Sequence, residues 1–137
     1  MRRNMVRAGL ASLAAAEAVA ALAGTASSAT DPTANVVGGR ERVKVSVISN
    51  SIPGPQACNV QINQQSRASF QIVPGGKYST VIAQVPPGTP TVKVTCGAAT
   101  LWDRPEPVEL ANPVLDAVDS VFISAGSSEL ATDAALR

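Results

Sequence analysis

The sequence predicts an all-β protein, an antiparallel β-sandwich of about seven strands that is cross-linked by one disulfide. Two observations carry this prediction. Short stretches of alternating apolar and polar residues follow one another after residue 40, with Pro- and Gly-rich turn signals about every 8 to 12 residues, and no stretch after residue 29 keeps a helical period. The only two cysteines, Cys58 and Cys96, both lie in such stretches.

The composition is that of one small domain with an aliphatic core. The chain has 137 residues, of which 45% are hydrophobic and 15% are charged. Because aromatic residues make up only 3%, the core has to be built from Val, Ile, Leu and Ala. The chain has no histidine, which excludes Ser–His–Asp and Cys–His catalytic sites and histidine metal ligands. We expect no catalytic residue, no metal site and no cofactor.

The N-terminal residues 1–29 are interpreted as a secretory signal peptide. Three arginines within the first seven residues precede an apolar stretch of about 17 residues, AGLASLAAAEAVAALAG. Ser27 and Ala29 then fit the small-residue positions before a cleavage site, and cleavage after Ala26 is the alternative. A retained membrane anchor is disfavoured because the stretch is short and carries Glu17 near its middle.

The net charge of the chain and its predicted export limit the classes of molecule that it can be expected to bind. Removal of the signal peptide leaves eight basic and nine acidic residues, a net charge of −1. A nearly neutral chain argues against nucleic acid or an acidic membrane as a partner. We therefore expect a secreted protein, extracellular or in the cell envelope, with an unknown protein or glycan partner. We expect it to be a monomer or to self-associate weakly, and not to bind a membrane after signal removal.

The remaining chain divides into three expected parts. Residues 30–40, TDPTANVVGGR, are expected to form a flexible N-terminal segment. The β-sandwich is expected over residues 41–125. Residues 126–137 are expected to form a C-terminal tail that is frayed or briefly helical.

The first three expected strands alternate clearly. In ERVKVSVIS, the residues Val43, Val45 and Val47 alternate with polar residues, which is typical of a strand with one wet face. The turn NSIPGPQA leads to the second strand, CNVQIN. QQSR then leads to ASFQIV, where Phe70 and Ile72 share a face.

Turn signals separate the later strands. PGG precedes KYSTVIAQV, and PPG precedes TPTVKVTC. GAATLWDRPEP is expected to be a loop that holds the only tryptophan. PVEL is expected to be a short strand with Val108 and Leu110 in phase, and DSVFISA is expected to be the last strand, buried on both faces.

We expect Cys58 and Cys96 to form a structural disulfide, because two cysteines in an exported chain usually pair. Each falls in phase with the apolar residues of its strand, so both sulfur atoms point into the core and we expect the bond to join the two sheets. Closing a loop of about 38 residues stabilises the fold by on the order of 4 kcal/mol. The alternatives are a metal site, which would need more ligands, and a redox pair, which usually has CxxC spacing.

Two segments carry a family resemblance. GGKYSTVIAQVPPGTPTVKVT resembles the "GKY…LPPGTYTVTV" signature of transthyretin-like β-sandwich modules, and VSVISNSIPGPQACNVQI is similar to their first hairpin. These modules include the carboxypeptidase-regulatory-like and Cna-B-type domains of exported bacterial proteins. The resemblance covers Val43 to Thr95 and implies an immunoglobulin-like or transthyretin-like extracellular scaffold or adhesion module rather than a catalyst.

The chain departs from these families at several positions. Pro90 replaces the usual aromatic residue after PPGT, and the cysteine pair is not a hallmark of the family. Lys44 is expected to face solvent, so the internal isopeptide bond of some Cna-B-type modules is not carried over. Trp102 follows both cysteines, whereas a true immunoglobulin domain has its buried tryptophan between them.

Two Pro-containing loops are candidate binding sites. The segment WDRPEP offers Trp102, Asp103 and Arg104 to a partner, although Trp102 could instead cap the open end of the sandwich. The loop SIPGPQAC, braced by the adjacent cysteine, could present a rigid segment to a protease. Its candidate contact residues are Ile52, Pro53 and Gln56.

Two groups of polar residues are further candidates for a functional site. The outer face of the second strand is rich in amides that could bind a glycan or an edge strand, or simply be solvated: Asn59, Gln61, Asn63, Gln64 and Gln65. Carboxylates for a hydrolase could come only from Asp103 with Glu106 or Glu109.

The sequence therefore favours a small secreted non-enzymatic β-sandwich that acts by surface recognition or as an envelope-associated structural module. The alternative is an inhibitor of an extracellular protease that presents a rigid loop. A carboxylate-dependent hydrolase is the least favoured hypothesis.

Overall fold

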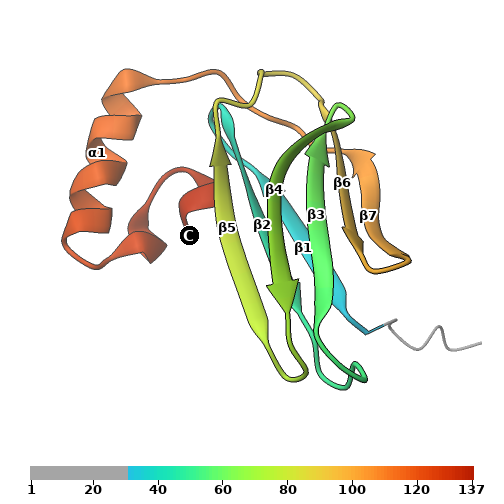
Figure 1. Ribbon diagram of the computed structural model, residues 1–137. Coiled ribbons are helices and arrows are strands. Elements are labelled where there is room, and N and C mark those ends of the chain that lie inside the picture. The colour runs from blue at the N-terminus through green and yellow to red at the C-terminus, as the bar shows by residue number, and fades with distance from the viewer. Residues whose placement is uncertain (1–30) are drawn as a thin grey trace, which may run out of the picture.

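Residues 31–137 form a two-layer β-sandwich with a helical C-terminal segment in the computed structural model (Figure 1). The predicted signal peptide lies outside these described residues. All strand pairs are antiparallel. The first sheet has the order β1-β2-β5, with bounds Thr33–Gly38, Arg42–Ile48 and Lys77–Ala83. The second has the order β4-β3-β6-β7, with bounds Gln65–Ile72, Gln56–Ile62, Thr91–Cys96 and Ala99–Pro105. The predicted all-β sandwich is confirmed.

The core is aliphatic, as the composition predicts, and consists mainly of valines from the central strands. The alternating valines of β2 are fully buried, as are those of β3 and β6 that face them: Val43, Val45, Val47, Val60, Val92 and Val94. Three of the four aromatic residues lie on strands at the edges of the sheets, and the fourth, Phe122, lies outside the sandwich strands. Phe70 of β4 stacks on Tyr78 of β5 with ring centroids 3.7 Å apart, and Trp102 of β7 packs against the core.

The disulfide between Cys58 and Cys96 is confirmed, but it does not join the two sheets. The cysteines lie directly opposite each other on β3 and β6, neighbours in the second sheet, with Cα atoms 4.1 Å apart. The inward phase of both residues was predicted correctly. The expectation of a bond between sheets was wrong, because phase shows which face a residue occupies and not which strand lies beside it.

Two segments expected to lack regular structure are strands. The expected flexible segment 30–40 contains β1, which pairs with β2 and buries Val36 in the core. The expected loop GAATLWDRPEP contains β7, because a tight turn at Gly97, with φ of 57°, folds the chain back onto β6. Both strands lie at sheet edges and lack a regular alternation of apolar and polar residues, so pairing with a neighbour, rather than their own pattern, determines their structure.

The prediction of the last two strands was wrong. PVEL forms only isolated bridges, from Val108 to Gly88 and from Glu109 to Arg40. DSVFISA belongs to a helix, α1 (Pro113–Ser124). The Asn112 side chain caps the helix by accepting a hydrogen bond of 3.2 Å from the backbone N–H of Leu115, and Pro113 occupies the first turn.

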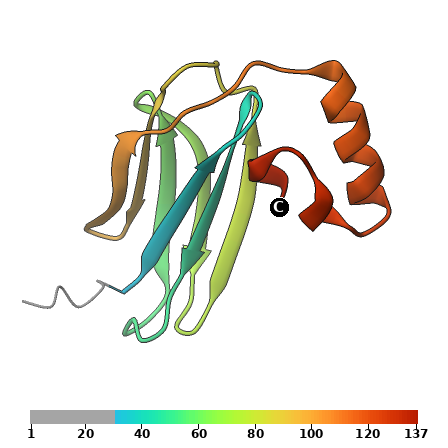
Figure 2. The same ribbon diagram turned by 180° about the vertical axis from the view of Figure 1, so that it is seen from behind.

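The expected C-terminal tail, residues 126–137, is docked on the protein rather than frayed. It contains two short 3-10 helices, η1 (Ser128–Leu130) and η2 (Ala134–Leu136). η1 packs beside α1, and η2 packs on β1 and β2 (Figures 1 and 2). Ala131, Asp133 and Ala135 are buried, so this segment is part of the folded domain.

The disulfide makes the first testable contribution to stability. Its two cysteines are 38 residues apart in sequence. Replacing both, Cys58→Ala with Cys96→Ala, is expected to lower the free energy of unfolding by about 2 to 4 kcal/mol, because the unfolded chain gains the entropy of an open loop. Urea denaturation monitored by circular dichroism measures this loss, and reduction of the wild-type protein should reproduce it. A loss below about 1 kcal/mol would contradict the prediction.

Candidate functional site

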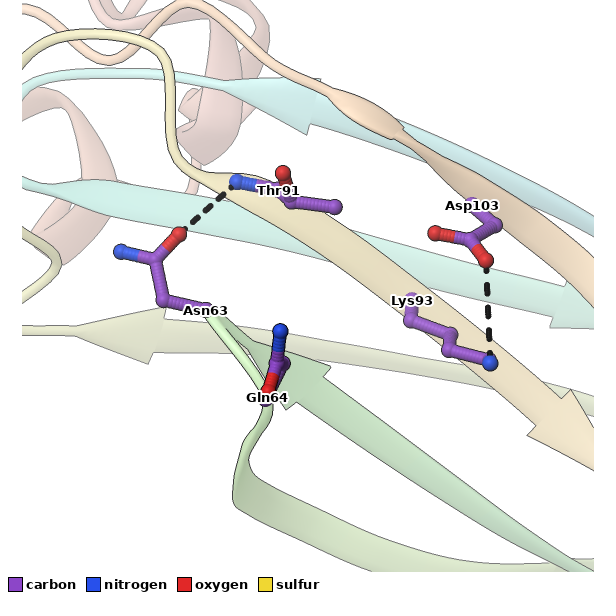
Figure 3. A pocket seen from close by; sticks show the side chains of 5 residues that line it. All are labelled: Asn63, Gln64, Thr91, Lys93 and Asp103. Carbon is purple, nitrogen blue, oxygen red and sulfur yellow. Dashed lines mark hydrogen bonds and ion pairs between the residues drawn. The ribbon is translucent and has the colours of Figure 1, made fainter.

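A polar pocket of about 400 Å³ lies where the β3–β4 turn meets β6 and β7 (Figure 3). Asn63 and Gln64 come from the turn, Thr91 and Lys93 from β6, and Asp103 from β7. Lys93 and Asp103 are opposite each other across the β6–β7 pair, on the face turned away from the core. The pocket therefore opens on the outer face of the second sheet.

The turn at the edge of this pocket is fixed by backbone geometry and by β6. Asn63 and Gln64 connect the paired residues Ile62 and Gln65, with φ of 50° and 68°. A two-residue turn of this kind needs positive φ at both positions, and glycine usually occupies the second. The Asn63 N–H donates to the Thr91 carbonyl at 2.9 Å, and the Thr91 N–H donates to Asn63 Oδ1 at 3.0 Å. Gln64 thus holds its side chain at the pocket in a left-handed conformation that glycine would adopt more easily.

The pocket carries one positive and one negative side chain. Lys93 Nζ lies 3.7 Å from Asp103 Oδ2, and the two side chains are 41% and 50% exposed. An exposed ion pair of this kind contributes little to the stability of the fold. Both side chains can therefore exchange this contact for one with a ligand. The lining therefore offers an ammonium donor, a carboxylate acceptor, amides and a hydroxyl, with no net charge.

The polar surface continues from the pocket along the second sheet. Asn59 Nδ2 donates to Ser66 Oγ at 2.7 Å and to Ser69 Oγ at 2.9 Å. An open depression of about 540 Å³ lies over this part of the sheet, lined in part by Asn59, Ser69 and Thr95. Part of the predicted amide-rich face therefore lies along a surface that is hollowed in two places.

Sequence reasoning identified only some of the pocket residues. Asn63 and Gln64 were expected on an amide-rich face, and Asp103 was expected in a separate loop. The structure brings them together, and adds Thr91 and Lys93, because β6 is placed between β3 and β7. Lys93 alternates with buried valines in TVKVTC, which was the available signal that it faces outward.

The predicted WDRPEP site is divided between two faces of β7. Trp102 and Arg104 lie on the core side, with the Arg104 guanidinium carbon 3.6 Å from the centre of the Trp102 ring. Asp103 lies on the outer face with Lys93. Trp102 therefore packs against the core from the edge strand β7 and does not share a surface with Asp103.

The predicted inhibitory loop is braced, but only part of it is displayed. Ile52 is buried in the core at 5% exposure, Pro53 is exposed, and Gln56 is half-buried at the start of β3. Asp31 accepts hydrogen bonds from the backbone N–H of Asn50, at 2.9 and 3.1 Å, and from Ser51. These backbone hydrogen bonds lower the pKa of the Asp31 carboxyl.

Two of the three carboxylates proposed for hydrolysis, Asp103 and Glu109, lie in different parts of the sandwich, and the third, Glu106, follows β7 and donates its backbone N–H to the Pro90 carbonyl at 3.0 Å. Asp103 pairs with Lys93 on the second sheet. Glu109 lies beside the end of the first sheet, where its backbone bonds to Gly39 and Glu41. The contacts of these residues give no support to a facing pair of catalytic carboxylates.

A second concentration of polar groups is buried where the C-terminal segment meets the sandwich, and Arg40 is at its centre. The Arg40 guanidinium donates to Asp116 at 2.9 Å, to Asp119 and to Thr132 Oγ1 at 2.9 Å. Its backbone N–H donates to Asp133 at 3.0 Å. Arg40, Asp119 and Asp133 are at most 4% exposed, so this is a buried ion-pair network.

Further donors supply hydrogen bonds and ion pairs to the aspartates of this network. Asp119 also accepts from the backbone N–H groups of Thr132, at 2.6 Å, and Asp133, at 3.0 Å. Arg42 adds ion pairs at 3.3 Å to Asp116 and to Asp133. A buried charge that loses its partner is strongly destabilising, so the network fixes where α1 and the chain end dock.

Both ends of the central ion pair have shifted pKa values. Burial by itself would lower the pKa of Arg40, but hydrogen bonds and charges of Asp116 and Asp119 outweigh it and raise that pKa. Burial would likewise raise the pKa of Asp119, but hydrogen bonds from Thr132, Asp133 and Arg40 lower it below the ordinary range. Both groups are therefore charged at neutral pH.

Removal of Arg40 is expected to release the C-terminal segment. Arg40→Met leaves buried aspartates without their main partner, so stability should fall by about 3 kcal/mol and amides of residues 113–137 should exchange faster. Denaturation and hydrogen exchange with mass spectrometry measure both effects. Arg67→Met, at an exposed arginine outside the network, is the matched control and should change stability by less than about 1 kcal/mol. Unchanged protection of 113–137 in Arg40→Met would contradict the role of the network.

The lowered pKa of Asp119 predicts a loss of stability in acid. Because the folded state holds the proton less tightly than the unfolded state, the contribution is full above the unfolded pKa of about 3.9 and disappears as the pH falls through the folded pKa. The stability difference between the wild type and Asp119→Asn, measured by urea denaturation, should therefore shrink between about pH 7 and pH 3. A difference that stays constant or grows in acid would contradict this assignment.

Comparison with known proteins returned no matching protein family, no matching curated protein and no matching solved structure. The resemblance to transthyretin-like and immunoglobulin-like modules therefore stays a prediction. Within residues 31–137, none of the helices has the length and hydropathy needed to cross a membrane.

Proposed function

We propose that this protein is an exported, non-enzymatic β-sandwich that recognises a neutral, hydroxyl-rich ligand, a glycan chain, through the pocket on its second sheet. The observation that carries the proposal is the meeting of Gln64, Lys93 and Asp103, from three separate parts of the chain, in one polar hollow (Figure 3). The leader sequence and the disulfide support export.

The chemistry of the lining favours a polyhydroxyl ligand. Sugar hydroxyls can donate to the Asp103 carboxylate while they accept from the Lys93 ammonium and the Gln64 amide. The lining has no net charge, so it does not select a strongly anionic or cationic ligand. The depression over Asn59, Ser69 and Thr95 extends the polar surface, which suits a chain rather than a single sugar.

The strained turn supports a binding role for Gln64. A non-glycine residue at positive φ raises the energy of the folded state, and such positions gather at ligand sites. The Gln64 side chain projects from the tip of a turn that is otherwise pinned to Thr91. A glutamine, rather than glycine, at this position is consistent with a contact to a ligand.

A protease inhibitor is the second candidate, favoured by the brace that Asp31 gives to the loop before β3. Inhibition needs an exposed loop residue that can enter a specificity pocket. Ile52, which is buried in the core, is not available for that contact. Pro53 and Gly54 would have to carry it, so we place this function below glycan recognition.

One substitution separates binding from stability. Gln64→Gly should raise the free energy of unfolding by about 0.5 to 1 kcal/mol, because glycine adopts positive φ without strain. It should also weaken glycan binding by about tenfold, because it removes a hydrogen-bonding side chain from the pocket. Biolayer interferometry with immobilised hexasaccharides of glucose, mannose and N-acetylglucosamine measures binding.

Gln84→Gly is the matched control. Gln84 also has a positive φ, of 57°, but lies outside the pocket. Its replacement should stabilise the protein to a similar degree and leave glycan binding unchanged. The proposal fails if none of the hexasaccharides binds, or if Gln64→Gly and Gln84→Gly bind them as well as the wild type does.

A further inference from the structure

The open depression on the second sheet differs in chemistry from the pocket beside it. Its lining includes two of the smallest residues in the chain, Ala57 of β3 and Gly97, which follows β6. Both are exposed, and they are neighbours, since the Gly97 N–H donates to the Ala57 carbonyl at 2.9 Å. Their side chains, a methyl group and a hydrogen atom, leave a small apolar hollow in a surface that is otherwise polar.

The backbone explains only one of these two small residues. Gly97 has φ of 57° in the tight turn from β6 to β7, a conformation that favours glycine. Ala57 lies in a regular strand, at an exposed position where larger, β-branched residues are preferred and alanine is disfavoured. The fold therefore does not require the space above Ala57, and a ligand group that enters this space gives the alanine a role.

Polar side chains on the neighbouring strand β4 border the apolar hollow. Gln71 lies opposite Ala57 in the β3–β4 register, and Ser69 lies opposite Asn59. The Ser69 hydroxyl accepts a hydrogen bond from Asn59 Nδ2 at 2.9 Å, so its own hydrogen can be donated to a ligand oxygen. The exposed Gln71 amide can both donate and accept. A methyl-sized hollow beside a hydroxyl donor and an amide complements a small group that carries a methyl and an amide of its own.

The disulfide lies directly beneath this depression. Cys58 is between two of its lining residues in β3, and Cys96 is between two others at the end of β6. Because side chains alternate along a strand, both sulfur atoms point into the core while the lining residues on either side point outward. The cross-link therefore holds the two strands that frame the depression at a fixed separation, which favours a preformed binding site.

We infer that the depression binds the acetamido group of an N-acetylated amino sugar, within the glycan chain that the adjacent pocket is proposed to bind; the inference rests on that proposed function. The acetamido methyl packs on Ala57, its carbonyl oxygen accepts from the Ser69 hydroxyl, and its N–H donates to Gln71. Lys93 of the pocket and Thr95 of the depression are two residues apart on β6, about 7 Å along the strand. Neighbouring sugars of one chain can therefore occupy both sites.

Other ligands fit the two sites together less well. A sugar that carries only hydroxyl groups leaves the Ala57 methyl facing a polar group or water. An uncharged peptide can place a backbone amide in the depression, but it brings no series of hydroxyls to Lys93 and Asp103. An N-acetylated sugar chain supplies the methyl, the amide and the hydroxyls in each repeating unit.

Two linear hexasaccharides that differ only at carbon 2 of each sugar test the inference: β-1,4-linked glucose, with a hydroxyl there, and β-1,4-linked N-acetylglucosamine, with an acetamido group. Isothermal titration calorimetry with the oxidised protein should show that the wild type binds the acetamido chain at least about tenfold more tightly. Ala57→Leu fills the hollow, so it should weaken binding of the acetamido chain about tenfold and change binding of the glucose chain by less than about threefold.

Two further variants complete the test. Ser69→Ala removes the hydroxyl donor without adding bulk and should weaken binding of the acetamido chain about fivefold. Ala83→Leu, at an exposed alanine of β5 in the other sheet, is the matched control and should bind both chains as the wild type does. Circular dichroism and the melting temperature verify that each variant is folded, and Ser69→Ala carries the test if Ala57→Leu is not.

The outcomes separate this inference from the proposed function. If the wild type binds the acetamido chain no more tightly than the glucose chain, the inference fails and glycan recognition stands. If no hexasaccharide of glucose, mannose or N-acetylglucosamine binds, both fail. A preference for the acetamido chain that persists in the folded Ala57→Leu and Ser69→Ala variants also overturns the inference. So does an uncharged, N-acetylated hexapeptide that binds as tightly as the acetamido chain.

Discussion

The buried ion pair between Arg40 and Asp119 determines how residues 113–137 are arranged on the sandwich. Arg40 lies between β1 and β2, and it binds the helix, the chain end and the loop between them at once. Hydrophobic burial alone would turn the apolar side of α1 toward the sandwich. The charges reverse that orientation, because an unpaired buried aspartate is more unfavourable than a few exposed valines.

The sandwich itself is held by a different means. Its core consists largely of valines, three of the four aromatic residues lie on edge strands, and the disulfide ties two neighbouring strands of the second sheet. That sheet also carries the polar pocket, whose lining comes from the β3–β4 turn, β6 and β7. The covalent bond between β3 and β6 therefore stiffens the strands that position the proposed binding residues.

The sequence by itself determined the strand-forming segments from β2 to β6, their apolar faces and the pairing of the cysteines. Alternation records which side of a strand is apolar, and that information is local. It does not record which strand lies beside which, so the same-sheet position of the disulfide and the meeting of Gln64 with Lys93 and Asp103 required the fold. The start of α1 was also encoded locally, by Asn112 and Pro113, although the short apolar run VFI favours strand and helix alike. The outward orientation of the helix was not encoded locally, because it depends on Arg40, 79 residues away from Asp119.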